Sequence, residues 1–244
     1  MPNDPLSYRD RTYRHRIEVK NLVSYEVKIK ESDLWICTHT DLSSSAFKTV
    51  LKYRRYIEDY ARGRSEFLTS FSPLSPDPLA PAIVRDMLDA SSKTGVGPMA
   101  SVAGAIAQYV ALDLLAESDE VIVENGGDLF VRTSRDLKIG IFAGESILSG
   151  RVSLKIKEKD MPMGVCTSSG TVGHSVSLGR ADAACILSHS AVTADAAATA
   201  VGNLVQKDSD IRKAMNYGME IEGVLGVLII KGDKIGVLGE IEIC

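Results

Sequence analysis

The sequence has no CxxC pair, no apolar run near the roughly 20 residues that a membrane span needs, and no excess of positive charge. Its four cysteines, Cys37, Cys166, Cys185 and Cys244, are far apart, which argues against a zinc knuckle or a redox pair. The net charge of −4 argues against a nucleic-acid surface. Because the first ten residues are polar and no apolar segment follows, we expect no secretory signal, no membrane association and a cytoplasmic protein with reduced thiols.

The composition is that of an ordinary globular protein, with 45% hydrophobic and 25% charged residues in a chain of 244. Four of the eight prolines lie within residues 71–81, which predicts an extended loop and the best candidate boundary in the chain. We expect residues 1–70 to supply N-terminal strands and a helix, and residues 82–244 to form the core. All three parts are expected to belong to one domain.

Alternating apolar residues predict strands, and apolar residues at helical spacing predict helices. The predicted strands cover residues 23–30, 34–39, 120–124, 129–132, 137–142, 152–156, 164–170, 181–187, 224–230 and 235–243. The predicted helices run from the cap residues 41–45 to near Gly63, and over 82–90, 99–116, 193–206 and 208–217. The charged face of the first helix, with Arg54 and Glu58 among its members, is expected to be solvated.

The stretch Val192–Val205 carries a pattern that suits a metal site. Thr193 can serve as the N-cap of a helix, with Asp195 in its first turn. Thr199 lies four residues after Asp195, so a carboxylate and a hydroxyl share one face whose neighbours are nearly all alanine. Oxygen ligands of this kind suit Mg²⁺. The alternative is an aspartate that complements the helix dipole and a threonine that bonds to its own turn.

Two glycine-rich segments are candidates for contact with a ligand. Gly97 precedes Pro98 and a helix whose first residues are small, so its N–H groups could face an anion, or the small residues could serve close helix packing. Asn125-Gly126-Gly127-Asp128 lies between two predicted strands. It is either a hairpin turn and no more, or a turn whose bare backbone lies against a ligand.

Residues 164–170 predict a strand that ends in hydroxyl groups and a glycine, a composition that suits phosphates or flavin edges and also occurs in ordinary loops. Cys166 within it is either a reactive thiol or a small buried hydrophobe. His174 follows in a polar loop and is the most loop-like of the four histidines.

Three segments together resemble the ApbE-like family of flavin transferases: ENGGDLFV (124–131), GVCTSSG (164–170) and TADAAATAV (193–201). Their order and rough separation also match, and the similarity covers about Gly95–Val205. The resemblance implies a two-layer α/β (α+β) fold of mostly antiparallel sheets with helices packed outside. It also implies Mg²⁺ bound by Asp195, Thr199 and a backbone carbonyl near Ala100, with His174 as a catalytic contact. The residues implied for the FAD or FMN pocket are Gly97, Asn125, Gly126, Gly127, Asp128, Thr167, Ser168, Ser169 and Gly170.

The sequence departs from the family pattern in two places. The family's lysine in the glycine-rich helix would fall near Ala103, and the segment His174–Arg180 keeps the histidine and a glycine but lacks the family's Asp, Pro and Thr. The chain therefore resembles the small, cytoplasmic, uncharacterised branch of the family. That branch leaves three hypotheses. The first is an enzyme, or a former enzyme, that binds a flavin nucleotide with Mg²⁺, as an FMN transferase or FAD hydrolase does. The second is an accessory protein for sulfide assimilation into homocysteine, with Cys166 or a partner's persulfide as the sulfur carrier. The third is a binding module without chemistry. We also expect a small-molecule nucleotide ligand and a homodimer.

Overall fold

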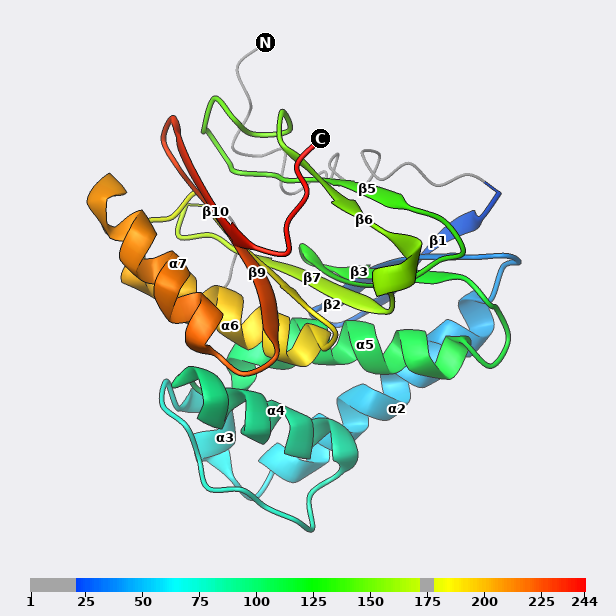
Figure 1. Cartoon of the computed structure of the whole chain (residues 1–244). Coiled ribbons are helices and arrows are strands. Elements are labelled where there is room, and N and C mark those ends of the chain that lie inside the picture. Colours follow the sequence, from blue (N-terminus) through cyan, green and yellow to red (C-terminus); the bar gives the residue numbers. More distant parts are fainter. Residues whose placement is uncertain (1–20, 172–177) are drawn as a thin grey trace.

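The computed structural model describes residues 21–171 and 178–244. Its main element is an eight-stranded antiparallel sheet with the strand order β1-β2-β3-β4-β7-β8-β9-β10. The strands are β1 (Val23–Ile29), β2 (Ser32–Thr38), β3 (Val121–Asn125), β4 (Asp128–Arg132), β7 (Met163–Ser168), β8 (Ala183–Ser188), β9 (Val224–Lys231) and β10 (Lys234–Gly239). A two-stranded sheet of β5 (Leu137–Gly140) and β6 (Ser153–Ile156) lies over one face (Figure 1).

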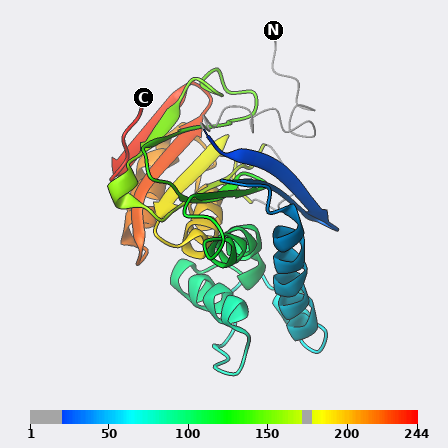
Figure 2. The same cartoon turned by 90° about the vertical axis from the view of Figure 1, so that its right-hand side faces the viewer.

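The helices gather on the other face of the large sheet, as Figures 1 and 2 show from two directions. They are α2 (Ser43–Ala61), α3 (Ser65–Thr69), α4 (Ala82–Thr94), α5 (Val102–Leu114), α6 (Ala191–Leu204) and α7 (Ile211–Glu220). Short 3₁₀ turns, η2 (Pro98–Ser101), η3 (Glu158–Asp160) and η4 (Asp208–Asp210), lie between the regular elements. This arrangement confirms the expected two-layer fold of antiparallel sheets with helices packed outside.

The large sheet separates two hydrophobic cores because successive side chains of a strand point to opposite faces. In β9, Val227 and Ile229 join the core on the helix side, whereas Leu228 and Ile230 join the core under β5 and β6. Both faces of the central strands are therefore covered, which explains why their sequences read as nearly continuous apolar runs rather than as strict alternation.

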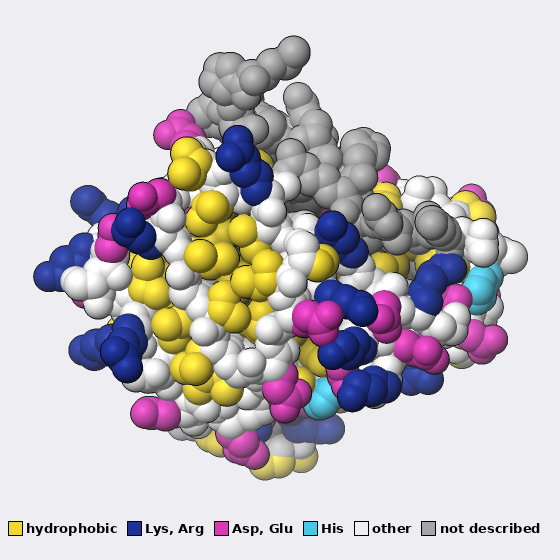
Figure 3. All heavy atoms as spheres, turned by 45° about the horizontal axis from the view of Figure 1, so that its top comes forward, with side chains coloured by type: hydrophobic (Ala, Val, Ile, Leu, Met, Phe, Trp, Pro, Cys, Tyr) yellow, Lys and Arg dark blue, Asp and Glu magenta, His cyan; other side chains and the backbone are white. Residues whose placement is uncertain are grey.

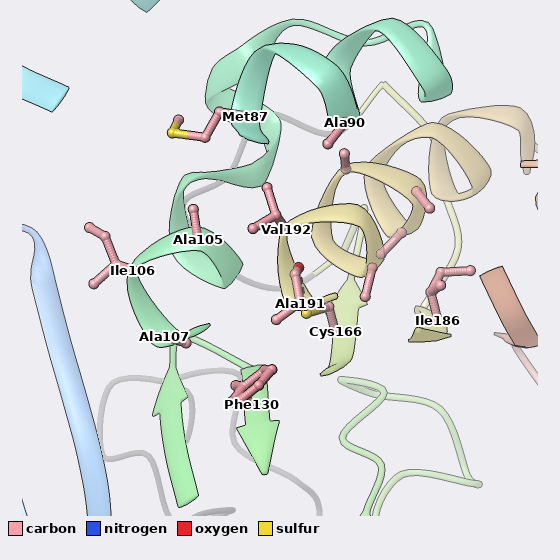
Figure 4. Close-up of a cluster of buried hydrophobic side chains, with 14 of the residues drawn as sticks. Met87, Ala90, Ala105, Ile106, Ala107, Phe130, Cys166, Ile186, Ala191 and Val192 are labelled. Carbon is pink, nitrogen blue, oxygen red and sulfur yellow. Dashed lines mark hydrogen bonds between the residues drawn. The ribbon is translucent and has the colours of Figure 1, made fainter. Parts of the chain in front are cut away.

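Small residues let α6 lie unusually close to its neighbours. A Cβ atom at Gly104 of α5 would collide with the carbonyl oxygen of Ala191, and one at Gly164 of β7 would collide with the Cα atom of the same alanine. Figure 4 shows Ala191 and Cys166 side by side at the start of α6, next to the first turns of α5. The alanine-rich sequence of α6 thus serves close packing against α5 and β7.

Most predicted elements exist, with shifted ends. The helix predicted over 82–90 continues to Thr94, the one predicted over 208–217 lies at Ile211–Glu220, and the last strand ends at Gly239 rather than at 243. After Gly239, whose positive φ of 83° turns the chain, the tail crosses to β6 and forms an isolated bridge with it. Residues 70–81 contain no helix or strand, as the prolines predicted.

Among the described helices, none is by itself long and apolar enough to cross a membrane. Only together do Ala82–Thr94 and Pro98–Leu114 have the length and apolar composition of a membrane span, and the pair is bent by 107°.

Candidate functional site

The helix that carries the predicted metal ligands begins two residues earlier than predicted. Its N-cap is Ser190, whose side-chain oxygen accepts a hydrogen bond from the Thr193 N–H at 3.3 Å. The prediction of Thr193 as N-cap is therefore wrong, and Asp195 lies beyond the first turn. The sequence offered two hydroxyl residues three positions apart, and the first has the extended backbone that an N-cap requires.

Asp195 is buried and its carboxylate faces the start of α5. The Oδ2 atom accepts a hydrogen bond of 2.8 Å from the backbone N–H of Gly104, one of the first-turn N–H groups that has no acceptor within its own helix. Burial raises the pKa of Asp195 from 3.8 to about 7, against the opposing effect of the backbone N–H groups of Gly104 and Ala103. Because Asp195 lies beyond the first turn of α6 and contacts α5 instead, the alternative in which it complements the dipole of its own helix does not hold.

A second buried carboxyl group, that of Asp128, lies close enough to Asp195 for the two to interact electrostatically. Burial raises the pKa of Asp128 well above its usual range, and the neighbouring Asp195 carboxylate raises it further. Asp128 Oδ1 accepts a hydrogen bond of 3.3 Å from the Thr167 N–H. The GGD turn, the hydroxyl-rich end of β7 and α6 therefore converge, although they lie far apart in the sequence.

Cys166 is fully buried within this group, so the interpretation as a small buried hydrophobe agrees with the structure. Its Sγ atom donates to the carbonyl oxygen of Ala191 at 3.4 Å. Burial raises the pKa of the thiol well above its usual value, and the carboxyl groups of Asp128 and Asp195 add to that effect. A buried thiol with a raised pKa lacks the exposed, positive surroundings of reactive cysteines, and the role of Cys166 as a sulfur carrier stays a prediction.

The GGD turn is a two-residue hairpin turn between β3 and β4, since Gly126 and Gly127 have φ angles of 70° and 106°. The Gly127 N–H donates to Glu124 Oε1 at 2.7 Å, and Asn125 Nδ2 donates to the Ala103 carbonyl oxygen at 3.1 Å. The turn is thereby fixed to the N-terminal turn of α5. The hairpin is confirmed, whereas contact of its backbone with a ligand stays a prediction.

The remaining predicted residues lie around this centre or outside the described ranges. Gly97 is the residue before η2, and a Cβ atom there would collide with the Ser70 carbonyl oxygen, so this glycine has a packing role. Ala100 lies within η2. Thr199 is in α6 and partly exposed. His174 lies outside the described residues.

The hydroxyl-bearing residues at the end of β7 divide between strand and turn. Thr167 and Ser168 are the last two residues of β7. The turn begins with Ser169 and is closed by Gly170, whose N–H donates to the Ala181 carbonyl oxygen at 2.9 Å. Of these residues, Thr167 contacts Asp128 through its backbone N–H, and their role as walls of a flavin pocket stays a prediction.

A cavity of about 860 Å³ opens beside the start of α5, between that helix, α2, α3 and the β1–β2 turn. Asn125 and Ala103 line it, so it adjoins the converging segments; Asp195 is not among its lining residues. Its apolar wall is made by Ile57, Ala61, Leu68, Met99, Val102 and Ile106. Its charged rim is made by Lys30, Glu31, Arg54, Glu58 and Arg62.

Arg54 corrects one prediction about α2. Its side chain is only 11% exposed, and it donates hydrogen bonds of 2.7 Å to Ser32 Oγ, 2.7 Å to Glu31 Oε2 and 2.9 Å to Glu58 Oε1. The expectation of a solvated face is wrong here because the β1–β2 turn, more than 20 residues earlier in the sequence, folds onto α2. An arginine within a helical face gives no signal of such a contact.

The oxygen atoms of this site fit the metal that the resemblance implies. Asp195 and Thr199 supply a carboxylate and a hydroxyl. Among the described residues, the main influences on the pKa of Asp195 and Asp128 are burial, backbone N–H groups and neighbouring acidic or thiol groups, not positive side chains. A buried carboxylate without a cationic neighbour is where a bound cation would be stabilising. No cluster of three or more His, Cys, Asp or Glu side chains suited to a metal occurs in residues 21–171 and 178–244, so such a site would depend on hydroxyl and carbonyl oxygens.

Comparison with known sequences gives one family and one set of relatives. The model of the family described as AbpE bacteria matches residues 14–237. A UPF0280 protein of Methanococcus aeolicus is 38% identical over 226 residues, which cover 90% of this chain and 91% of the relative. A UPF0280 protein of Methanothermobacter thermautotrophicus is 42% identical over 198 residues, which cover 79% and 76% respectively.

Comparison with solved structures gives the same fold. The flavin transferase ApbE from Vibrio cholerae superimposes with a TM-score of 0.56 at 12% identity and covers 89% of this chain and 96% of its own. The ApbE protein from Thermotoga maritima superimposes with a TM-score of 0.58 at 13% identity and covers 88% and 96%. The resemblance that the three sequence segments predicted is thereby confirmed.

Proposed function

Because the chain belongs to the AbpE bacteria family, we propose that it binds a flavin nucleotide, FAD or FMN, together with Mg²⁺ beside the start of α5. The observation that carries this proposal is the convergence of Asp195, Asp128 and the Thr167 backbone next to the 860 Å³ cavity. The structural neighbours named as flavin transferases support the choice of ligand class.

The metal ligands in this proposal are Asp195, Thr199 and a carbonyl oxygen near Ala100. The Gly104 N–H holds Asp195 through Oδ2, and the Ala103 N–H also favours the ionised carboxylate, so the group is oriented toward the start of α5, where a cation would bind. Burial, and secondly the neighbouring Asp195 carboxyl group, raise the pKa of Asp128, which favours a protonated Asp128 that acts as a neutral hydrogen-bonding group beside the metal ligand. Mg²⁺ would supply positive charge that stabilises the diphosphate of the nucleotide and polarises it for attack.

The cavity suits the ring portion of such a ligand. Its volume falls within the roughly 300–1,000 Å³ that is usual for small-molecule pockets. Apolar side chains from α2 and α5 can contact a planar ring, while Asn125 and the charged rim can hydrogen-bond to polar groups. Ala103, where the family has a lysine, leaves the wall of this cavity uncharged.

The reaction that follows binding is either transfer of FMN to a hydroxyl group of a protein or hydrolysis of FAD to FMN and AMP. Both reactions break the diphosphate, and both depend mainly on positioning and on charge stabilisation. The assay measures release of AMP from FAD with Mg²⁺ present. AMP released only with a threonine-containing acceptor protein indicates transfer, AMP released without the acceptor indicates hydrolysis, and no AMP in either case indicates a protein that binds without reacting.

Binding is tested by calorimetric titration with FAD and FMN, in Mg²⁺ and in EDTA. Asp195→Asn should remove the Mg²⁺ dependence while keeping an acceptor for the Gly104 N–H. Asp182→Asn is the matched control, because Asp182 is also buried and accepts a backbone N–H, that of Gly232, at 2.6 Å. Unchanged Mg²⁺-dependent binding by Asp195→Asn would contradict the metal role.

The cavity is tested by filling it. Val102→Trp places a large side chain into the space beside α5 and should weaken flavin binding by about tenfold or more, as loss of good contacts in a pocket does. Leu112→Trp is the control on the same helix, since Leu112 is 46% exposed and does not line the cavity. Equal binding by the two variants would place the ligand elsewhere.

A further inference from the structure

Within the described residues β10 is the last strand of the large sheet, and it pairs only with β9. Its outer edge presents the main-chain groups of every second residue. Ile230 of β9 directs its carbonyl oxygen toward β8, where it accepts the Asp182 N–H at 2.9 Å. Because Ile235 lies opposite Ile230, the N–H and C=O groups of Ile235 and of Val237 point away from the sheet.

The two ends of the sheet differ in how they discourage association. The edge strand β1 carries Glu26 and Lys28, which are about half exposed and form an ion pair at 2.9 Å. Charges of this kind are a usual protection of an edge strand. Residues 235–239 of β10 carry no charge, and Ile235 and Leu238 are 40% and 38% exposed. An uncharged, apolar edge favours pairing with another strand.

Apolar side chains continue beyond the strand on the face toward β5 and β6. Ile147 is 63% exposed, and the adjacent Ser146 hydroxyl donates to the Gly232 carbonyl oxygen at the β9–β10 turn. Ile243 in the tail beside β6 is 45% exposed. Figure 3, which brings the β5, β6 and β10 end of the molecule forward, shows hydrophobic side chains gathered in one patch there.

We propose that β10 pairs antiparallel with β10 of a second copy of this chain, so that two sheets join into one across a twofold axis at Gly236. With the axis at Gly236, Ile235 lies opposite Val237 of the other copy and Gly236 lies opposite itself, so every side chain keeps its face. That register joins the outward-pointing main-chain groups of Ile235 and Val237, and it places two apolar side chains opposite each other on the β5–β6 face.

The strand supports pairing with a second copy, because in this register the apolar side chains of Ile235 and Val237 face each other across the axis in both directions. Gly236 has no side chain at the axis, where its own face is already covered by Ile211 and Met215 of α7. In this register Lys234 lies opposite Leu238 of the other copy, two residues before Glu240, so residues of opposite charge flank the pair. A stable interface buries roughly 1,200 Å² or more, so the proposed dimer requires the exposed side chains of Ile147 and Ile243 to be covered together with the strand.

Sedimentation velocity of the full chain over a range of concentrations tests the association. We expect a species of twice the chain mass, with Ile235→Lys raising the dissociation constant about 100-fold because a charge enters a desolvated pair. Val23→Lys on the opposite edge is the control, since Val23 is 44% exposed on β1, and it should leave the dimer intact. Circular dichroism verifies that each variant is folded.

Cross-linking tests the register. In a Cys244→Ser background, Ile235→Cys and Val237→Cys in one chain should form two intermolecular disulfides, because opposite Cα atoms in a hydrogen-bonded pair lie about 5.5 Å apart. Each single variant should not cross-link alone, and a mixture of the two should. A monomeric wild-type protein at every concentration, or cross-linking by a single variant alone, would overturn the proposal.

Discussion

Replacing Asp195 by asparagine should stabilise the metal-free protein in alkaline solution and have little effect in acid. The carboxyl group is buried against the Gly104 N–H, and burial raises its pKa from the ordinary 3.8 to about 7. A raised carboxyl pKa means that the folded protein holds the proton more tightly than the unfolded chain. The stabilisation from that proton is complete below pH 3.8 and is lost as the pH rises toward 7.

The magnitude follows from the two pKa values. Each pKa unit corresponds to 1.36 kcal/mol, so ionising Asp195 in the folded protein costs about 4 kcal/mol above pH 7. Asparagine is neutral at every pH and still offers an oxygen to Gly104. The stability of Asp195→Asn relative to wild type should therefore rise by about 4 kcal/mol between pH 4 and pH 8, or about 10 °C in Tm for a chain of this size.

The assay is thermal and urea unfolding in EDTA at both pH values. Asp182→Asn is the control, and it should lose some stability at both pH values because the Gly232 N–H then donates to a neutral amide oxygen instead of a charged carboxylate. Mg²⁺ at pH 8 should stabilise wild type and leave Asp195→Asn unchanged. A difference between Asp195→Asn and wild type that does not change with pH would refute the electrostatic reasoning.

Three further predictions rest on packing and capping. In native protein an aromatic disulfide reagent should modify Cys244 rapidly and the three buried thiols only after denaturation, as counted by absorbance. Gly104→Ala should lower the free energy of unfolding by about 1–3 kcal/mol because its Cβ atom meets α6, whereas Gly63→Ala, where the space is open, should be neutral or slightly stabilising in the same urea titration. Ser190→Ala should lower the free energy of unfolding by about 1 kcal/mol because α6 loses its N-cap. Thr193→Ala should lower it by less because Thr193 does not cap the helix, and thermal unfolding measures both effects.

Local patterns were enough to predict the sheet and its hairpins. The Asn-Gly-Gly-Asp sequence predicted the β3–β4 turn because two successive residues with positive φ require glycine or its closest substitutes. In the turn between β9 and β10, Gly232 likewise has a positive φ of 59°. These turns depend on a few residues that are adjacent in the sequence, so the local sequence is enough to predict them.

Contacts between distant segments were not predictable in the same way. The Gly104 N–H and the Asp195 carboxylate are 91 residues apart in the sequence, and nothing near either residue indicates the other. The helical spacing of Arg54 and its charged neighbours predicts a solvated face, whereas its hydrogen-bond partners lie on the β1–β2 turn. The motifs indicated which residues matter, and the fold decided what each one touches.

The packing of α6 and its chemistry have one cause. Asp195 reaches the start of α5 because Gly104 lacks a side chain and lies directly against the Ala191 carbonyl group, so the two helices approach closely. The same approach excludes water and raises the pKa of the carboxyl group. A larger residue at either position would separate the helices, hydrate Asp195 and lower its pKa together. A carboxylate kept this poorly solvated is expected to bind a cation more tightly than an exposed one, and the small residues around it are therefore part of the proposed metal site.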